Sequence, residues 1–269
     1  MLINAFAMFK SKDISASYLA IRYSLEFLVV VFGITVSFWL NEWSQDRREM
    51  EFHHKDTVDL LADLSVDRER LTFIAQTIED GDKNMSRILR SHNRLQDGSV
   101  TYETFVDTLI AVGDPYGFPS FFMNRGTYKS LIGNGRLQHF PVKLEKQIKD
   151  YYEYVSKRVE DNNAIVDGIC IKYYQEHHIM TQMRPLDGDD RPEKVKQDHR
   201  EFLLRPQIRA DYESMEFFKA TVGMRSRIFS SRYQIALYRE MRDELDSAVR
   251  GYLSLQFGDA EPLPHPFDS

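Results

Sequence analysis

The sequence predicts an all-α protein, in which an N-terminal transmembrane helix is continuous with a long helix of an up-down helical bundle. An apolar run without a single charge lies near the N-terminus, at residues 27–40. Apolar residues recur at steps of three and four over long stretches of the remaining chain. The 13 glycines and 9 prolines are few among 269 residues, and the prolines lie almost entirely outside the periodic stretches. This distribution favours long helices over a sheet rich in turns.

The domain organisation follows from these patterns. We predict an N-terminal segment, a transmembrane helix, a helical bundle domain and a proline-rich tail, at residues 1–17, 18–43, 44–257 and 258–269. The bundle domain contains two segments without helical periodicity. They are an irregular cap rich in aromatic residues, glycine and proline, at 113–141, and an acidic polar loop at 183–206.

The composition excludes several classes of protein. A hydrophobic fraction of 42% is ordinary for a folded chain, so the protein is not disordered as a whole. The net charge of −6, with both signs interspersed, leaves no basic excess to neutralise phosphates, and we expect no nucleic acid among its partners. The single cysteine, Cys170, cannot form an intramolecular disulfide, and its sequence context indicates a buried thiol on a helix face.

The transmembrane helix is predicted from the run FLVVVFGITVSFWL and its flanks. At ~1.5 Å per residue the run is about 21 Å long, shorter than the ~30 Å of bilayer hydrocarbon. Aromatic residues at both edges match a membrane interface, with Tyr18 and Tyr23 before the run and Trp39 and Trp43 at its end. No small-residue cleavage site follows. We therefore predict an uncleaved single-pass anchor, rather than a signal peptide or a buried soluble helix.

One face of this anchor is polar and carries small residues. At 100° per residue the following positions share about a third of the circumference: Arg22, Glu26, Val30, Gly33, Ser37, Asn41 and Ser44. Arg22 and Glu26 lie four residues apart and can pair. Gly33 and Ser37 let another helix approach closely, while Glu26 and Asn41 are costly against lipid but acceptable against a partner helix. The face predicts a homo-oligomer or a complex with another membrane protein; alternatively Glu26 and Asn41 lie in the headgroup layer and Gly33 is incidental.

The charges that flank the anchor decide its orientation only narrowly. Three basic residues precede it and three follow it, so the positive-inside count is nearly a tie. The free N-terminus and the acidic residues just after the anchor favour an N-terminus in the cytoplasm. This places the soluble domain on the periplasmic side of a bacterial inner membrane.

The first bundle helix is predicted to continue from the anchor to about Asp80, because no glycine or proline occurs before Gly81. Its apolar stripe, interrupted only by Arg68, consists of Thr57, Leu61, Leu64, Leu71, Ala75 and Ile78. Gly81 and Asp82 are predicted to separate it from a second helix at 82–96. A third helix begins near Thr101, a residue type that caps helices, and ends near residue 112.

The segment from 113 to 141 contains five glycines and three prolines among aromatic residues. A short helix at 127–132 is predicted inside it. We expect the segment to pack across one end of the bundle as a cap, or alternatively to form a binding surface. The candidate residues of this surface are Tyr116, Phe118, Phe121, Phe122 and Tyr128.

Two long helices complete the predicted bundle, at 142–181 and 211–257, because apolar residues repeat at helical spacing in both. The segment between them is polar and contains the sequence DGDD at 187–190. The tail EPLPHPFDS is rich in proline and is expected to be extended.

Two blocks of the chain resemble an uncharacterised bacterial membrane-protein family, catalogued as a domain of unknown function (number 6090). EFLVVVFGI at 26–34, followed by LNEW at 40–43, is similar to its pattern E-x-L-x-V-x-x-G-I with an N-x-W exit. NRGTYKSLIGNGRL at 124–137 is similar to its block T-Y-x-x-L-x-x-x-G-x-L, and Tyr151-Tyr152 also fits. Glu42 departs from the family, whose members often have Asn there. The resemblance implies a bacterial single-pass membrane protein and implies no activity.

The sequence contains no catalytic or metal-binding signature. The adjacent histidines at 53–54 and 177–178 point about 100° apart on a helix, so neither pair can chelate one ion without a second helix. The glycine-rich phosphate-binding motifs and the nucleophile elbow do not occur. We therefore expect no enzymatic activity, no metal and no cofactor.

Two functions remain. The first is an oligomeric membrane-anchored scaffold or sensor, whose helical domain binds a partner or ligand and transmits through the first helix. The second is a small homo-oligomeric cation channel, in which Glu26 forms an acidic ring at the pore. Gly33 favours the first function, because close helix contact closes a pore.

Overall fold

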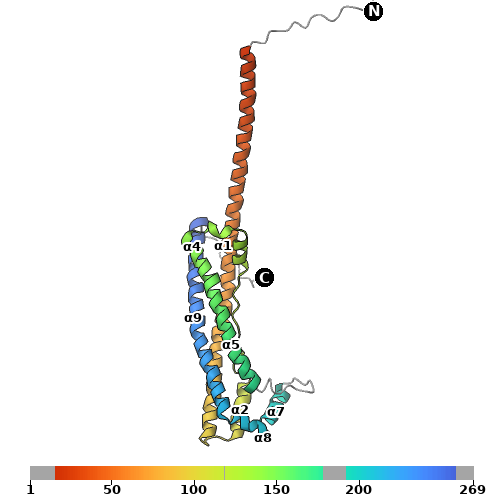
Figure 1. Ribbon diagram of the computed structural model, residues 1–269, viewed down its shortest axis with the longest axis vertical. Coiled ribbons are helices and arrows are strands. Elements are labelled where there is room, and N and C mark those ends of the chain that lie inside the picture. The colour runs from red at the N-terminus through yellow and green to blue at the C-terminus, as the bar shows by residue number, and fades with distance from the viewer. Residues whose placement is uncertain (1–15, 118, 178–191, 259–269) are drawn as a thin grey trace, which may run out of the picture. The chain divides into compact units, whose positions relative to one another are not determined.

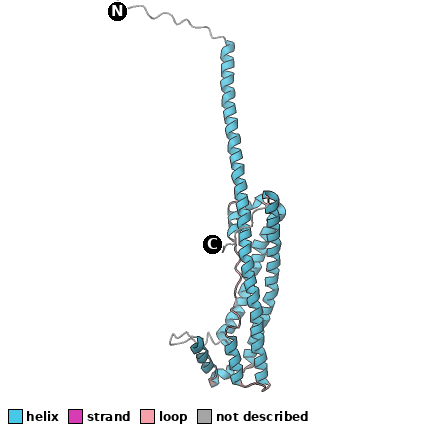
Figure 2. Ribbon diagram, turned by 180° about the vertical axis from the view of Figure 1, so that it is seen from behind, coloured by secondary structure: helices cyan, strands magenta, loops and turns pink. Residues whose placement is uncertain are grey.

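The computed structural model describes residues 16–117, 119–177 and 192–258, without the side chains of 16–20 (Figure 1). Every regular element in these residues is helical, as Figure 2 shows, and the predicted all-α fold class is confirmed. The chain divides into two compact units, Met1–Lys55 and Asp56–Ser269. Helix α1, Ala16–Gln96, contributes to both.

In the first unit, α1 carries the predicted anchor. Almost every side chain from 21 to 50 is exposed. An 18-residue window of this helix has a mean hydropathy of 1.8, and none of the window is buried. By length and composition the helix can cross a membrane, and its exposure sets it apart from the core helix of a soluble domain.

The second unit is built on three long helical elements. They are α1 from residue 56 onward, the continuous run of α4 (Val142–Lys149), η2 (Asp150–Val155) and α5 (Ser156–His177), and α9 (Met215–Phe257). The shorter helices are α2 (Tyr102–Val112), α3 (Gly126–Gly133), η1 (Arg136–His139), α7 (Pro192–Leu203) and α8 (Pro206–Tyr212).

The core of this unit follows a repeat of alternating three- and four-residue steps. On α1 the buried positions include Leu60, Leu64, Asp67, Leu71, Ile74, Ile78, Gly81, Met85 and Ile88. On α9 they include Phe217, Thr221, Met224, Ile228, Ser231, Ile235, Tyr238, Arg242, Leu245, Val249 and Leu253. This spacing keeps one stripe of each helix turned toward its neighbours. Each buried leucine contributes about 1.5–3 kcal/mol.

The middle long element contains one π-helical turn, η2. Its wider winding adds a residue to the turn and allows the adjacent Tyr151 and Tyr152 both to be buried, at 1% and 0% exposure. Tyr152 stacks on Tyr128 with ring centroids 4.9 Å apart.

Residues 113–117 and 119–125, which we call the strap, lie in extended form along the bundle (Figure 1). Near its start, Tyr116 packs against Gly81 of α1 and its amide donates to the hydroxyl of Tyr174 on α5. Near its end, the amide of Asn124 donates to Asp67 on α1. The strap thus returns the chain along the bundle, and α5 consequently runs parallel to α1 while α9 runs antiparallel to both.

The strap corrects the prediction that 113–141 packs across one end of the bundle. That prediction is wrong for 113–117 and 119–125, because backbone groups of the strap bond to side chains along two helices. Arg70 of α1 donates to the carbonyl of Phe122, and Asn163 of α5 donates to the carbonyl of Phe121, both at 2.8 Å. The predicted short helix at 127–132 is confirmed as α3.

Two further predictions are wrong in their boundaries. α1 does not end at Gly81 but continues to Gln96. A Cβ at this glycine would lie 2.6 Å from Cδ2 of Tyr116, so Gly81 permits close packing instead of ending the helix. The predicted acidic loop at 183–206 contains helices α7 and the start of α8, while 183–191 lie outside the described residues.

The start of the last helix also differs from the prediction. α9 begins at Met215 rather than at 211, because the hydroxyl of Ser214 caps it by accepting from the amide of Phe217. Thr101 caps α2 as expected, and accepts from the amide of Thr104. Most of the predicted N-terminal segment 1–17 lies outside the described part of the chain. The same is true of the predicted tail 258–269, except for its first residue.

Candidate functional site

The predicted interface on the anchor is an exposed, shallow groove along α1. It is lined by Val30, Gly33, Ile34, Ser37, Phe38 and Asn41. A Cβ at Gly33 would meet no atom within 4 Å, so this face is open to a neighbouring helix. The hydroxyl of Ser37 donates to the carbonyl of Gly33 at 2.8 Å. Asn41 has no hydrogen bond to its side chain among the described residues, which leaves its amide as the polar group on this face that needs a partner.

The ends of the anchor agree in part with the predictions. Arg22 and Glu26 form the expected ion pair, with Nε and Oε1 2.9 Å apart. Tyr23, Trp39 and Trp43 are exposed, as interface anchors must be. The side chain of Tyr18 lies outside the described residues.

The predicted aromatic binding surface is wrong for most of its members. Tyr116, Phe121 and Tyr128 are buried, at 2%, 1% and 4% exposure, because they fill the space between the strap, α3 and the long helices. Phe122 is exposed, while Phe118 lies outside the described residues. The three buried rings therefore stabilise the bundle, and the described members of the set form no shared aromatic surface.

Two carboxylates on α1 fix the far end of the strap. Asp67 is fully buried and accepts from the amide of Asn124 at 2.8 Å and from the hydroxyl of Tyr151 at 2.9 Å. Asp63 accepts from the side-chain amide of Asn124 and from the amide of Thr127. Burial raises the pKa of Asp67 to about 6, although both of its hydrogen bonds act in the opposite direction.

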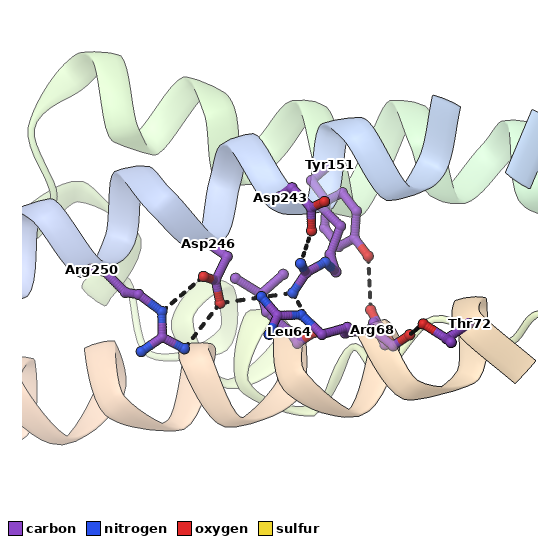
Figure 3. Close-up of polar contacts among 9 residues, drawn as sticks. Leu64, Arg68, Thr72, Tyr151, Asp243, Asp246 and Arg250 are labelled. Carbon is purple, nitrogen blue, oxygen red and sulfur yellow. Dashed lines mark hydrogen bonds and ion pairs between the residues drawn. The ribbon is translucent and has the colours of Figure 1, made fainter. Parts of the chain in front are cut away.

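The core of the bundle also contains a buried arginine, Arg242, and Figure 3 shows Leu64, Asp243 and Asp246, which contact it. Arg242 on α9 is 1% exposed, and its guanidinium donates to the carbonyl of Leu64 on α1 at 3.3 Å. It also pairs with Asp243 and with Asp246, the latter at 3.8 Å. Asp246 in turn pairs with Arg250 at 2.8 Å. A cluster of charged side chains thus lies within a largely apolar core.

This charged cluster was not predicted from the sequence, although two arginines in apolar repeats indicate it. Arg68 was recognised only as a break in the first stripe. Arg242 occupies a core position of the repeat that runs through Ile235, Tyr238 and Leu245, where an apolar residue is expected. A charge at such a position indicates a buried ion pair or a ligand contact.

The described residues contain neither a metal-binding cluster nor a reactive thiol. No group of three or more His, Cys, Asp or Glu side chains is arranged there to hold a metal ion. Of the two histidine pairs, one includes His178, which lies outside the described chain. Cys170 is buried as predicted, and burial raises the pKa of its thiol to about 12, so it is not a reactive thiolate.

Comparisons with models of known protein families, with curated proteins and with solved structures give no match. The resemblance to the bacterial family numbered 6090 is therefore neither supported nor contradicted, and it stays a prediction. The candidate sites rest on sequence and geometry.

Proposed function

We propose that this chain is a single-pass membrane protein of the bacterial inner membrane, which self-associates through the Gly33 face of α1 and acts as a scaffold or sensor module. The observation that carries the proposal is the exposed apolar surface of α1 between 21 and 43. The resemblance of its two blocks to a bacterial membrane family is a second support. The acidic residues just after the anchor favour a bundle domain on the periplasmic side.

The exposed apolar surface argues for a lipid environment. Phe27, Val29, Phe32 and Phe38 are 67–71% exposed, and their apolar neighbours are also solvent-accessible. Soluble monomers rarely expose a continuous apolar patch above a few hundred Å². Each Å² of such surface costs about 25 cal/mol in water, and a bilayer removes this cost. The helix continues past Trp43 into a charged segment without a small-residue cleavage site, which favours an anchor over a signal sequence.

The groove at Gly33 argues for a second copy of the chain as partner. Small residues at 33 and 37 allow two helix backbones to approach closely. Asn41 lies one turn farther along the same groove. Because an amide both donates and accepts, Asn41 can bond to the same residue of a symmetry-related helix. Association thereby satisfies a group that is costly against lipid.

The contacts of Glu26 favour a scaffold or sensor over a cation channel. A cation-selective ring requires carboxylates that face the pore with their negative charge available. Here Arg22 pairs with Glu26 within the same helix and offsets that charge. The small residues farther along the face favour closed packing, which leaves no pore between helices.

Replacing Gly33 with leucine tests self-association in full-length protein purified in detergent. A leucine side chain would fill the groove and hold the helices apart, so a discrete oligomer should dissociate to monomers. The measurement is the protein mass after subtraction of bound detergent. The control is Val31→Leu, which introduces the same side chain about 200° around the helix and should preserve the oligomer.

A monomeric unmodified protein, or an unchanged mass after Gly33→Leu, would overturn the proposed interface. Membrane anchoring is measured separately. The protein should remain in the membrane pellet after alkaline carbonate extraction, and its release into the supernatant would refute the anchor.

A further inference from the structure

A cavity of about 230 Å³ opens beside the charged cluster. Arg68 and Thr72 of α1 line one wall, and Arg239, Arg242 and Asp243 of α9 line the other. All five residues belong to the compact unit Asp56–Ser269. The cavity is therefore formed without any contribution from the membrane anchor or from the Gly33 face.

The cavity has an excess of positive charge. Three guanidinium groups and one carboxylate line it, which gives a net charge of +2. Extending the count to Asp246 and Arg250, which pair with each other at 2.8 Å, leaves the same sum. Among the described residues, neither Arg68 nor Arg239 has an ion pair or a hydrogen bond to its side chain.

The third arginine is held in place from inside the bundle. The guanidinium of Arg242 contacts Leu64, Asp243 and Asp246, and its side chain is only 2% exposed. Burial, and then the neighbouring charge of Arg68, lower the pKa of Arg242. Arg68 and Arg242 thus carry like charges on opposite walls of a cavity whose single lining carboxylate, Asp243, is already paired with Arg242.

Arginine is suited to one ligand chemistry in particular. Its planar fork of N–H donors matches the oxygens of a phosphate group in bidentate contacts. A net charge of +2 matches a dianion better than a monocarboxylate. Thr72, whose hydroxyl donates to the carbonyl of Arg68, lies one turn from this arginine and lines the same wall.

We propose that the cavity between Arg68, Arg239 and Arg242 is a binding site for a phosphate dianion, either as inorganic phosphate or as the phosphate group of a small phosphomonoester. Arg242 is the preorganised donor at the base of the site. Arg68 and Arg239 are exposed at its mouth and close on the ligand. The bound dianion offsets the repulsion between the guanidinium groups.

Isothermal titration of the full-length protein in detergent tests this site. The probes are inorganic phosphate, glycerol phosphate and acetate, each at constant ionic strength set with chloride. We expect saturable binding of a phosphate compound, and affinity reduced about tenfold or more in Arg68→Gln and in Arg239→Gln, because each loses a charge-assisted contact. Arg90→Gln removes an exposed charge from α1 outside the cavity and should leave the affinity unchanged.

Stability in the absence of phosphate provides a second readout. Arg68→Gln should raise the melting temperature of the ligand-free protein, because it removes the like charge that faces Arg242. The same variant should lose most of the increase in melting temperature that phosphate gives to the unmodified protein. This opposite pair of effects distinguishes a binding residue from a residue that only stabilises the fold.

The proposal is overturned if no phosphate compound binds, if acetate binds as tightly, or if Arg68→Gln and Arg90→Gln behave alike. Binding of either phosphate compound that depends on Arg68 and Arg239 supports it. The tighter of the two then shows whether free phosphate or a monoester is the ligand.

Discussion

The stability of the bundle should depend on pH through one buried carboxylate, Asp67. In the folded protein the pKa of Asp67 is about 6, against 3.8 for an ordinary aspartate. The folded state therefore binds this proton more tightly than the unfolded state does. Stability from this group is fully present below pH 3.8, decreases as pH rises, and is lost once pH passes about 6.

The magnitude follows from the difference between these two values. A shift of about two pKa units at 1.36 kcal/mol each corresponds to about 3 kcal/mol in total. Between pH 4.5 and pH 7.5 the free energy of unfolding should fall by about 2 kcal/mol through this group. The change is smaller than the total because Asp67 in the unfolded state is already largely ionised at pH 4.5. Asp67→Asn should remove this dependence, because the amide is neutral at both values. Its side-chain oxygen can still accept from the amide of Asn124.

The assay is urea unfolding of the full-length protein in detergent, followed by circular dichroism at pH 4.5 and 7.5. The quantity compared is the free energy of unfolding of the unmodified protein minus that of Asp67→Asn, which should decrease by about 2 kcal/mol as pH rises. Asp150→Asn serves as the control, because it changes an exposed carboxylate next to Tyr151. Parallel pH profiles for the unmodified protein and Asp67→Asn would refute the reasoning, as would an equal effect of Asp150→Asn.

Two pairs of substitutions test the packing of the core by urea unfolding. Arg242→Ala should destabilise the bundle by about 3–5 kcal/mol, because it empties a buried position and removes one partner of Asp246. Arg242→Met should destabilise it less, because methionine fills the buried position again and Asp246 keeps its ion pair with Arg250. Equal losses for both would contradict this view of the charged cluster. Gly81→Ala should cost about 1–3 kcal/mol, because its Cβ would clash with Tyr116, whereas Gly223→Ala, with no atom near its Cβ, should stabilise its helix by up to about 1 kcal/mol. A stabilising Gly81→Ala would show that the close contact at Tyr116 is not required.

The sequence by itself determined the helical class, the apolar helix near the N-terminus and most of the long helices. These features depend on local interactions, in which residues three and four apart share a face of one helix. The ion pair of Arg22 with Glu26 and the caps at Thr101 and Ser214 are of the same local kind. Thr101 was predicted near the start of its helix, whereas Ser214 was not, because the last helix was predicted to begin at 211.

Only the tertiary structure decided what the exceptions to these patterns do. Gly81 is a residue type that often ends a helix, but Tyr116 from a distant segment packs on it and the helix continues. The strap had no pattern from which its course could be inferred, because its backbone groups bond to side chains of two separate helices. Asp67 and Tyr151 are 84 residues apart, and Arg242 and Leu64 are 178 apart. A charge in an apolar repeat is visible in the sequence, but its partners are fixed only when long-range packing brings the helices together.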